Sequence, residues 1–138
     1  MIYGAEAWTL RRKDEELLER TEMRMLRWML GVSLKDRRRN MDIRRAVGVT
    51  CITDKVREAR LRWYGHVRRR EEDVNVRSIM DAEVQGHRSR GRQRKRWIDA
   101  VREDLKLLRL TDDDVENRDK WRRRIHVADP SPEGLIPA

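Results

Sequence analysis

Apolar residues near the start of the chain recur at helical spacing and predict an amphipathic helix over about residues 10–30. Thr9 precedes this segment as a candidate N-cap, and Gly31 follows it as a candidate C-terminal stop. We expect the inward face to be Leu18, Met25 and Met29, widened by Leu17, Leu26 and Trp28.

Two more helices are predicted between residues 40 and 70. Asn40 can cap a short helix that Gly48 ends, and Thr53 can cap a longer helix over about 54–70. The longer helix carries Val56, Trp63 and Val67 along one side. A short helix, a brief connection and a long helix form the outline of helix-turn-helix units, although most helical hairpins bind no DNA.

The second half of the chain is also predicted to be helical. We expect a helix from Val74 to Ala82 and another over about 94–109, then a last helix that begins in a capping box of Thr111 and Asp114. The inward residues of these last two helices are expected to be Trp97, Ile98, Val101, Leu105, Leu108, Val115, Trp121 and Ile125.

These elements predict an all-α protein of four to six helices, arranged as two small lobes joined by a basic linker. The expected divisions are a helical region over 1–85, a linker over 86–96, a helical hairpin over 97–128 and a disordered tail over 129–138. Pro130 and Pro132 stop the last helix and begin that tail.

Composition narrows the possible partners. The chain has 34 basic and 25 acidic residues, a net charge of +9, and this surplus favours a polyanion. Hydrophobic residues make up 38% of the chain and Phe is absent, so the isolated chain is expected to be marginally stable. Apolar helix faces that lack a neighbour could also make it self-associate.

The sequence favours an intracellular location. Cys51 is the only cysteine, so an intrachain disulfide is excluded and a reducing compartment fits. No apolar run approaches the length of a membrane span, so we expect no membrane partner. The run Arg-Gln-Arg-Lys-Arg over 92–96 resembles short nuclear-import signals and favours a nuclear location.

Catalytic and metal-binding motifs are not apparent. Cys51, His66, His87 and His126 are scattered without the short paired spacings of zinc sites. The acidic run 112–114 follows a capping Thr and is explained by the helix dipole. No triad motif or glycine-rich phosphate loop is present, so we expect no catalytic residues, no metal and no cofactor.

Two clusters of arginine and aromatic residues, over 60–70 and 88–97, are the strongest functional signal. Guanidinium groups pair with phosphates, and aromatic rings stack on unpaired bases. Trp63 and Tyr64 point about 100° apart on a helix, so we assign Trp63 to the core, together with Trp28, Trp97 and Trp121, and Tyr64 to a stacking or interface role. The candidate nucleic-acid contacts are Arg60, Arg62, Tyr64, Arg68, Arg69, Arg88, Arg90, Arg92, Arg94, Lys95 and Arg96.

The order of these motifs resembles the segment that follows the palm in reverse transcriptases of non-LTR retrotransposons, in particular RTE-like elements. The resemblance runs from Tyr3 to about Pro132. It rests on Tyr3–Leu10, Glu22–Trp28, Arg39-Asn40, Ile43–Arg45, Val56–Val67, Gly91-Arg92, Arg96-Trp97, Asp104-Leu105 and Arg118–Arg122.

The resemblance implies a C-terminal fragment with thumb helices and a basic extension, but without the endonuclease and the catalytic palm. The parent family is RNA-directed DNA polymerase, and nothing here matches its aromatic-Ala-Asp-Asp motif. In such a fragment the helix with Arg60, Arg62, Arg68 and Arg69 and the connector over 90–96 would face RNA, DNA or a hybrid.

The chain departs from the family at two positions. Gln93 stands where Pro is usual, which predicts a less stiff linker, and Arg68 stands where an apolar residue is common. Two alternatives stay open at this point: a sequence-specific helix-turn-helix-like module, and an inert, poorly folded relic.

Overall fold

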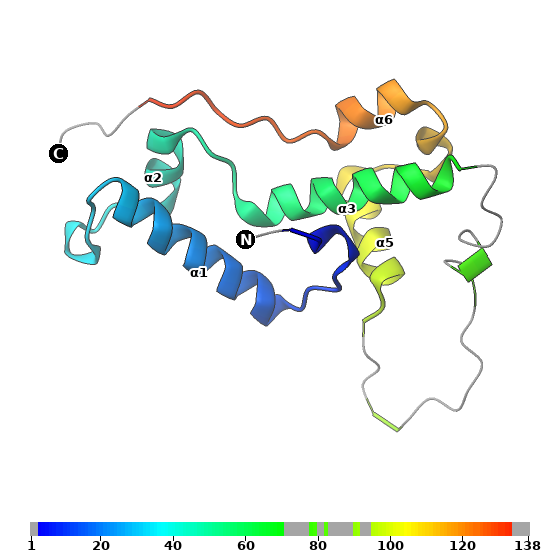
Figure 1. Ribbon diagram of the computed structural model, residues 1–138, viewed down its shortest axis with the longest axis horizontal. Helices are drawn as coiled ribbons and strands as arrows, with labels where there is room; N and C mark the ends of the chain where they lie inside the picture. The colour runs from blue at the N-terminus through cyan, green and yellow to red at the C-terminus, as the bar shows by residue number, and fades with distance from the viewer. Residues whose placement is uncertain (1–2, 71–77, 80–81, 83–89, 92–94, 134–138) are drawn as a thin grey trace. The chain divides into compact units, whose positions relative to one another are not determined.

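The computed structural model describes residues 3–70, 78–79, 82, 90–91 and 95–133, and this part of the chain is helical without strands (Figure 1). The fold class is therefore all-α, as the sequence predicts. Most of the predicted helix over 74–82 and most of the predicted linker lie outside the described residues. The described α-helices are α1 (Arg12–Met29), α2 (Asn40–Val47), α3 (Ile52–Arg68), α5 (Trp97–Leu108) and α6 (Arg118–Ile125), with short 3₁₀ turns η1 (Ala5–Ala7), η2 (Leu34–Asp36) and η3 (Asp112–Val115).

Glycine ends both early helices, as predicted. Gly31 and Gly48 have φ angles of 64° and 75°, in the left-handed region that glycine tolerates best. The start of α1 differs from the prediction, because the backbone N–H of Arg11 donates to the carboxylate of Asp14 at 2.9 Å. Asp14 therefore closes the first turn, and Thr9 lies outside the helix.

The chain folds as two compact units that meet within α3. The α1–α2 unit comprises Leu10–Val56 and Val127–Ala138, and the α5–α6 unit comprises Met1–Thr9 and Arg57–His126. This division differs from the predicted segments, because the later turns of α3 share a core with α5 and α6. Each unit is described separately.

In the α1–α2 unit, Met23 and Leu26 of α1 are buried with Ile43 of α2. A nearby ion pair joins Glu22 to Arg44, with 2.7 Å between the carboxylate and a guanidinium nitrogen. Of the six residues predicted to face inward on α1, Leu26 is buried, Leu18 is half-buried and the other four are exposed. The residues that remain exposed lie on the opposite side of the helix: Leu17, Met25, Trp28 and Met29.

Trp28 is 84% exposed, which corrects its assignment to the core. Apolar residues occur on two sides of α1, so periodicity alone does not decide which side is buried. The side with Met23 is buried because α2 packs there.

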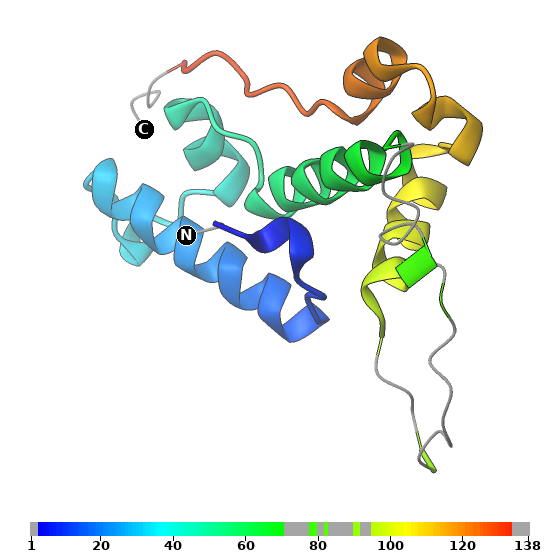
Figure 2. The ribbon, with the colours of Figure 1, turned by 45° about the vertical axis from the view of Figure 1, so that its right-hand side comes forward.

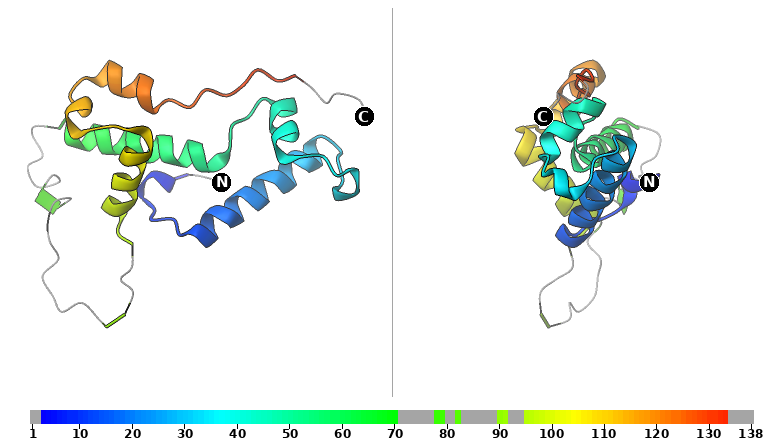
Figure 3. Two further views of the ribbon diagram at one scale, coloured as in Figure 1. Left: turned by 180° about the vertical axis from the view of Figure 1, so that it is seen from behind. Right: turned by 90° about the vertical axis from the view of Figure 1, so that its left-hand side faces the viewer.

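The segment after α6 belongs to the α1–α2 unit and is hydrogen-bonded to the rest of that unit as far as Glu133, contrary to the predicted loose tail (Figure 3). The Thr50 N–H donates to the carboxylate of Asp129 at 3.0 Å, and the Lys55 ammonium donates to the carbonyl of Val127 at 2.6 Å. Gly48 leaves room for this segment, since a Cβ there would lie 2.8 Å from the carbonyl oxygen of Pro130. The rest of the predicted tail, 134–138, lies outside the described residues.

The core of the α5–α6 unit is formed by Leu61, Tyr64, Val101, Leu110, Val115, Trp121 and Ile125. Trp121 is fully buried, as predicted, and its indole N–H donates to the carbonyl of Leu61 at 3.2 Å. Trp97 is half-buried and packs against this core. Figure 2 shows α6 lying along the later turns of α3, with α5 crossing beneath.

The last predicted helix is divided in two. The Thr111 N–H donates to the carboxylate of Asp114 at 3.0 Å, as the capping box predicts, but this box begins only the turn η3. Asn117 then caps α6, because its side-chain oxygen accepts a hydrogen bond from the N–H of Lys120 at 2.9 Å.

Gly65 of α3 permits the close approach of Trp121. A Cβ at this position would lie 2.9 Å from the indole Cδ1 and closer still to Nε1. Trp121 is fully buried and packs in one cluster with Leu61, Tyr64 and Ile125, so it has little freedom to move away.

We therefore expect Gly65→Ala to destabilise the protein by about 1–2 kcal/mol, because overpacking outweighs the gain in helix propensity. Urea unfolding followed by circular dichroism measures this change. The double variant Gly65→Ala, Trp121→Leu should lose less than the sum of the single variants. Stabilisation by Gly65→Ala, as for an uncrowded helical glycine, would contradict the packing described.

Candidate nucleic-acid interface

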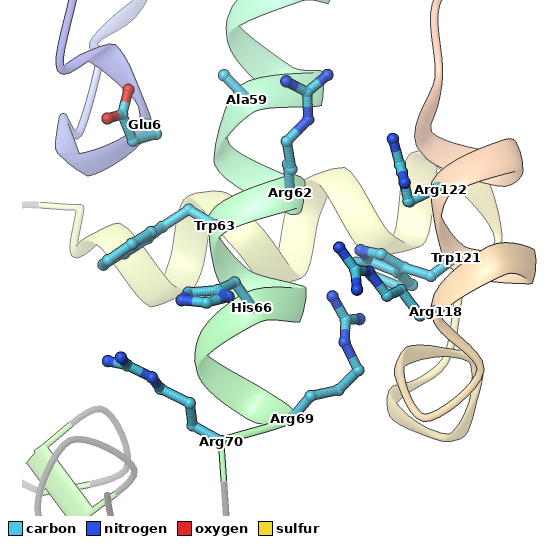
Figure 4. Close-up of a pocket in the computed structure, with 10 residues that line it drawn as sticks. All are labelled: Glu6, Ala59, Arg62, Trp63, His66, Arg69, Arg70, Arg118, Trp121 and Arg122. Carbon is cyan, nitrogen blue, oxygen red and sulfur yellow. The ribbon is translucent and has the colours of Figure 1, made fainter.

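A cleft of about 840 Å³ lies over α3, between α6 and η1 (Figure 4). All of its residues belong to the α5–α6 unit. They include five arginines and a single carboxylate, so the cleft carries a strong positive charge. The lining residues are Glu6, Ala59, Arg62, Trp63, His66, Arg69, Arg70, Arg118, Trp121 and Arg122.

Helical spacing brings these side chains together. Arg62 and His66 of α3 and Arg69, which follows its last residue, are spaced at intervals of four and three, so they share one face. On α6, Arg118 and Arg122 are four residues apart and flank Trp121. Because Trp121 fixes α6 against α3, the two arginines of α6 face the same cleft as Arg62 and Arg69 (Figure 4).

Arg69 is the most enclosed of these cations. Its guanidinium donates to the carbonyl of Val115 at 2.9 Å, a neutral partner. Burial lowers the pKa of Arg69 below its ordinary value, and the positive charge of Arg118 lowers this pKa further. The two cations therefore repel each other, and an anion placed between them would relieve that repulsion.

The other arginines of the cleft differ in their partners. Arg62 donates to the carboxylate of Glu58, a buried residue that also lies 3.5 Å from the ring of His126. Arg118 and Arg122 are exposed, and neither pairs with a carboxylate of the described residues. Arg118 and Arg122 are therefore well placed to receive an anion from solution.

The structure reverses the predicted burial of Trp63 and Tyr64. Trp63 is 44% exposed in the cleft, with its ring centroid 5.6 Å from that of His66. Tyr64 is buried in the core, and its hydroxyl donates to the carboxylate of Asp112 at 2.5 Å. Burial and this neighbouring acid raise the pKa of Tyr64. The core side of α3 passes through Leu61 and Tyr64, so Trp63 points away from it.

Two more predicted contacts have structural partners inside the unit. Arg60 is buried, and 2.7 Å separates its guanidinium from the carboxylate of Asp104, which corrects its assignment to a nucleic-acid-facing surface. Arg68 is half-buried, donates to the hydroxyl of Tyr64 at 3.1 Å and lies over its ring. Of the contacts predicted over 60–69, Arg62 and Arg69 lie in the cleft.

The predicted contacts in the linker are only partly described. Arg90 and Arg96 are exposed, and Lys95 pairs with Glu103 of α5. The predicted contacts Arg88, Arg92 and Arg94 lie outside the described residues.

Sequence reasoning missed the contribution of α6 to this surface. Arg118 and Arg122 were part of a motif, yet their position beside Arg69 depends on packing between distant segments. The signal available was their spacing of four around Trp121, which places both arginines next to a predicted core residue.

The described part of the chain lacks the features of a metal site and of a membrane span. It holds no group of three or more His, Cys, Asp or Glu side chains placed for a metal ion. None of its helices combines the length and the apolar character that crossing a membrane requires.

Comparison of the chain with protein-family models, with curated proteins and with solved structures finds no match in any of the three. The resemblance to non-LTR reverse transcriptases stays a prediction from the sequence motifs. The cleft itself is the structural feature from which a function can be argued.

Asp114 holds the start of α6 in place and so orients the α6 wall of the cleft. Its carboxylate accepts hydrogen bonds from Lys120 at 2.7 Å, from the N–H of Thr111 and from Arg124 at 2.9 Å. These partners, Lys120 first and Thr111 next, lower the pKa of Asp114 well below its ordinary value of 3.8. The stabilisation is therefore present above pH 3.8 and is lost as the pH falls through the lower, folded-state pKa.

We expect Asp114→Asn to lower the melting temperature near neutral pH and to flatten its fall in acid, since the variant lacks the ionised partner. Thermal melts from about pH 7 to about pH 2 measure both effects. Asp113→Asn, at an exposed acid of the same turn, is the matched control. Parallel pH curves for Asp114→Asn and the unmodified chain would contradict this role.

Proposed function

We propose that this chain is a non-catalytic C-terminal fragment of a non-LTR retrotransposon reverse transcriptase that binds RNA or DNA electrostatically. The observation that carries the proposal is the gathering of five arginines and one carboxylate around a single cleft. The sequence motifs support it independently, because Arg62, Arg118 and Arg122 all lie in blocks that resemble that family.

Binding would begin with the phosphate backbone. Each guanidinium that meets a phosphate releases a condensed counterion, which gives affinity that falls steeply with salt. The planar guanidinium groups of Arg118 and Arg122 can each bind a phosphate through two N–H groups. Such contacts fix the position of a strand without reading its bases, so weak sequence dependence is expected.

The basic linker would add further positive charge. Arg90 and Arg96 are exposed, and the remaining cations of 88–96 add charge along the chain. A polyanion held by the linker would act together with the cleft. The same basic run supports a nuclear location as part of this proposal.

The helix-turn-helix alternative has less support from the contacts of α3. A recognition helix presents side chains of its first turns to the bases. Here the cations of those turns have internal partners: Lys55 pairs with Asp129 in the α1–α2 unit, and Arg57 and Arg60 pair with Asp104 in the α5–α6 unit. The relic alternative predicts no cooperative unfolding, whereas the cores of the two units predict a helical signal that melts.

We expect a steep dependence of affinity on salt for a labelled single strand and for an RNA–DNA hybrid. The double variant Arg118→Gln, Arg122→Gln should reduce the slope of log affinity against log salt by about 1.5, because two phosphate contacts are lost. Fluorescence anisotropy measures this slope.

Arg12→Gln, Arg102→Gln is the matched control, since it removes the same charge from exposed arginines outside the cleft. Its slope should stay close to that of the unmodified chain. Equal reductions in both double variants would indicate a general charge effect, and absence of binding at low salt would contradict the proposed function itself.

The proposed absence of catalysis predicts that a primed RNA template is not extended when nucleotides and Mg²⁺ are supplied. A primer-extension gel with a full-length reverse transcriptase as positive control measures this. Incorporation of nucleotides by the purified chain would overturn the non-catalytic assignment.

A further inference from the structure

The two sides of the cleft have different chemistry. Toward α6 lie the guanidinium groups of Arg62, Arg69, Arg118 and Arg122 (Figure 4). Toward η1 lie the rings of Trp63 and His66, with the guanidinium group of Arg70 on the same side (Figure 4). A cleft with most of its arginines on one side and exposed aromatic rings on the other matches a ligand that carries both a phosphate and a ring.

Trp63 is not needed for the core of its unit. That core contains Tyr64 and Trp121, and 44% of the Trp63 side chain stays exposed. An indole at this degree of exposure offers a large flat surface to a ligand. Its position in a cleft rich in arginine separates it from exposed apolar residues that are scattered singly.

The η1 wall is held in place and carries Glu6, the one acid among the described residues that line the cleft. The indole N–H of Trp97 donates to the backbone carbonyl of Glu6 at 2.7 Å, which ties η1 to α5. The Glu6 carboxylate repels phosphates on this side, so the phosphates are directed toward α6. A strand in the cleft would therefore place its bases next to Trp63.

From this division we infer that the cleft selects single-stranded nucleic acid, with an unpaired base stacked on Trp63 and adjacent phosphates bound by Arg69, Arg118 and Arg122. In a duplex the bases are already stacked on one another, so their faces cannot reach the indole. The inference rests on the proposed function, because it names which form of nucleic acid the same site prefers. Since every base has a flat face, stacking adds affinity without sequence specificity.

The test compares three labelled ligands of about twelve nucleotides: a single strand, its duplex, and the same strand with abasic positions. The abasic strand keeps the phosphates and removes the rings, so it isolates stacking from charge. We expect the single strand to bind roughly tenfold more tightly than the abasic strand, as one base–aromatic stack provides. DNA and RNA strands are run in parallel, and the difference is expected with both because they share the base face.

Variants locate the effect. Trp63→Ala should lose the same roughly tenfold on the intact strand and little on the abasic strand, whereas Trp63→Phe should keep most of the affinity. Trp28→Ala is the matched control, because Trp28 is exposed on α1 and does not line this cleft. Circular dichroism of each variant checks that the helices are retained.

The outcomes separate this inference from the function on which it rests. Equal binding of intact strand, abasic strand and duplex, with no effect of Trp63→Ala, overturns the single-strand preference but leaves electrostatic binding intact. An equal loss for Trp63→Ala and Trp28→Ala likewise contradicts a specific stacking role. No binding of any ligand at low salt overturns the proposed function as well.

Discussion

The contact between Trp121 and α3 at Gly65 determines the arrangement of the α5–α6 unit. A side chain at position 65 would collide with the indole, and the indole N–H bonds to the carbonyl of Leu61. Truncating a buried tryptophan costs about 3–5 kcal/mol, whereas a pair of exposed like charges costs only a few tenths of a kcal/mol. Packing therefore outweighs repulsion, and this explains how the arginines of α6 are held beside those of α3.

Charge in this chain serves two purposes that composition does not separate. Arg44 and Arg60 are paired with Glu22 and Asp104 at 2.7 Å, one pair in each unit. Removing one partner of a buried pair leaves an uncompensated charge, so these arginines are part of the structure. Arg118 and Arg122 are exposed beside Arg69 without a carboxylate of the described residues. The positive charge available to a polyanion is therefore concentrated in the cleft, where packing of α6 on α3 brings these arginines together.

The sequence predicts the helices well because the signals for a helix, its end residues and its apolar spacing, lie within the helix itself. Gly31 and Gly48 end helices through their own backbone angles, and Trp121 follows the apolar spacing of its helix. The faces of helices were harder to predict. Trp63 and Tyr64 are neighbours with similar apolar character, and the partner that decides between them, Trp121, lies far along the chain. Periodicity identifies a face but does not say whether a partner covers it.

The remaining differences also depend on distant segments. The final extended segment binds through Thr50 and Asp129, which are 79 residues apart, so no local signal could have revealed it. Arg60 was read with the exposed arginines because its partner Asp104 is 44 residues away. The cleft is formed by η1, α3 and α6, so no single sequence motif predicts it.

The most direct test of the central claim is to observe the arginine side chains while a single-stranded oligonucleotide is added. In nuclear magnetic resonance spectra of the guanidinium N–H groups, the account predicts that Arg69, Arg118 and Arg122 shift together and saturate at one ligand concentration. The signal of Arg102, which is exposed on α5 outside the cleft, should not shift. Shifts spread evenly over the exposed arginines, or confined to those outside the cleft, would contradict a binding site between α3 and α6.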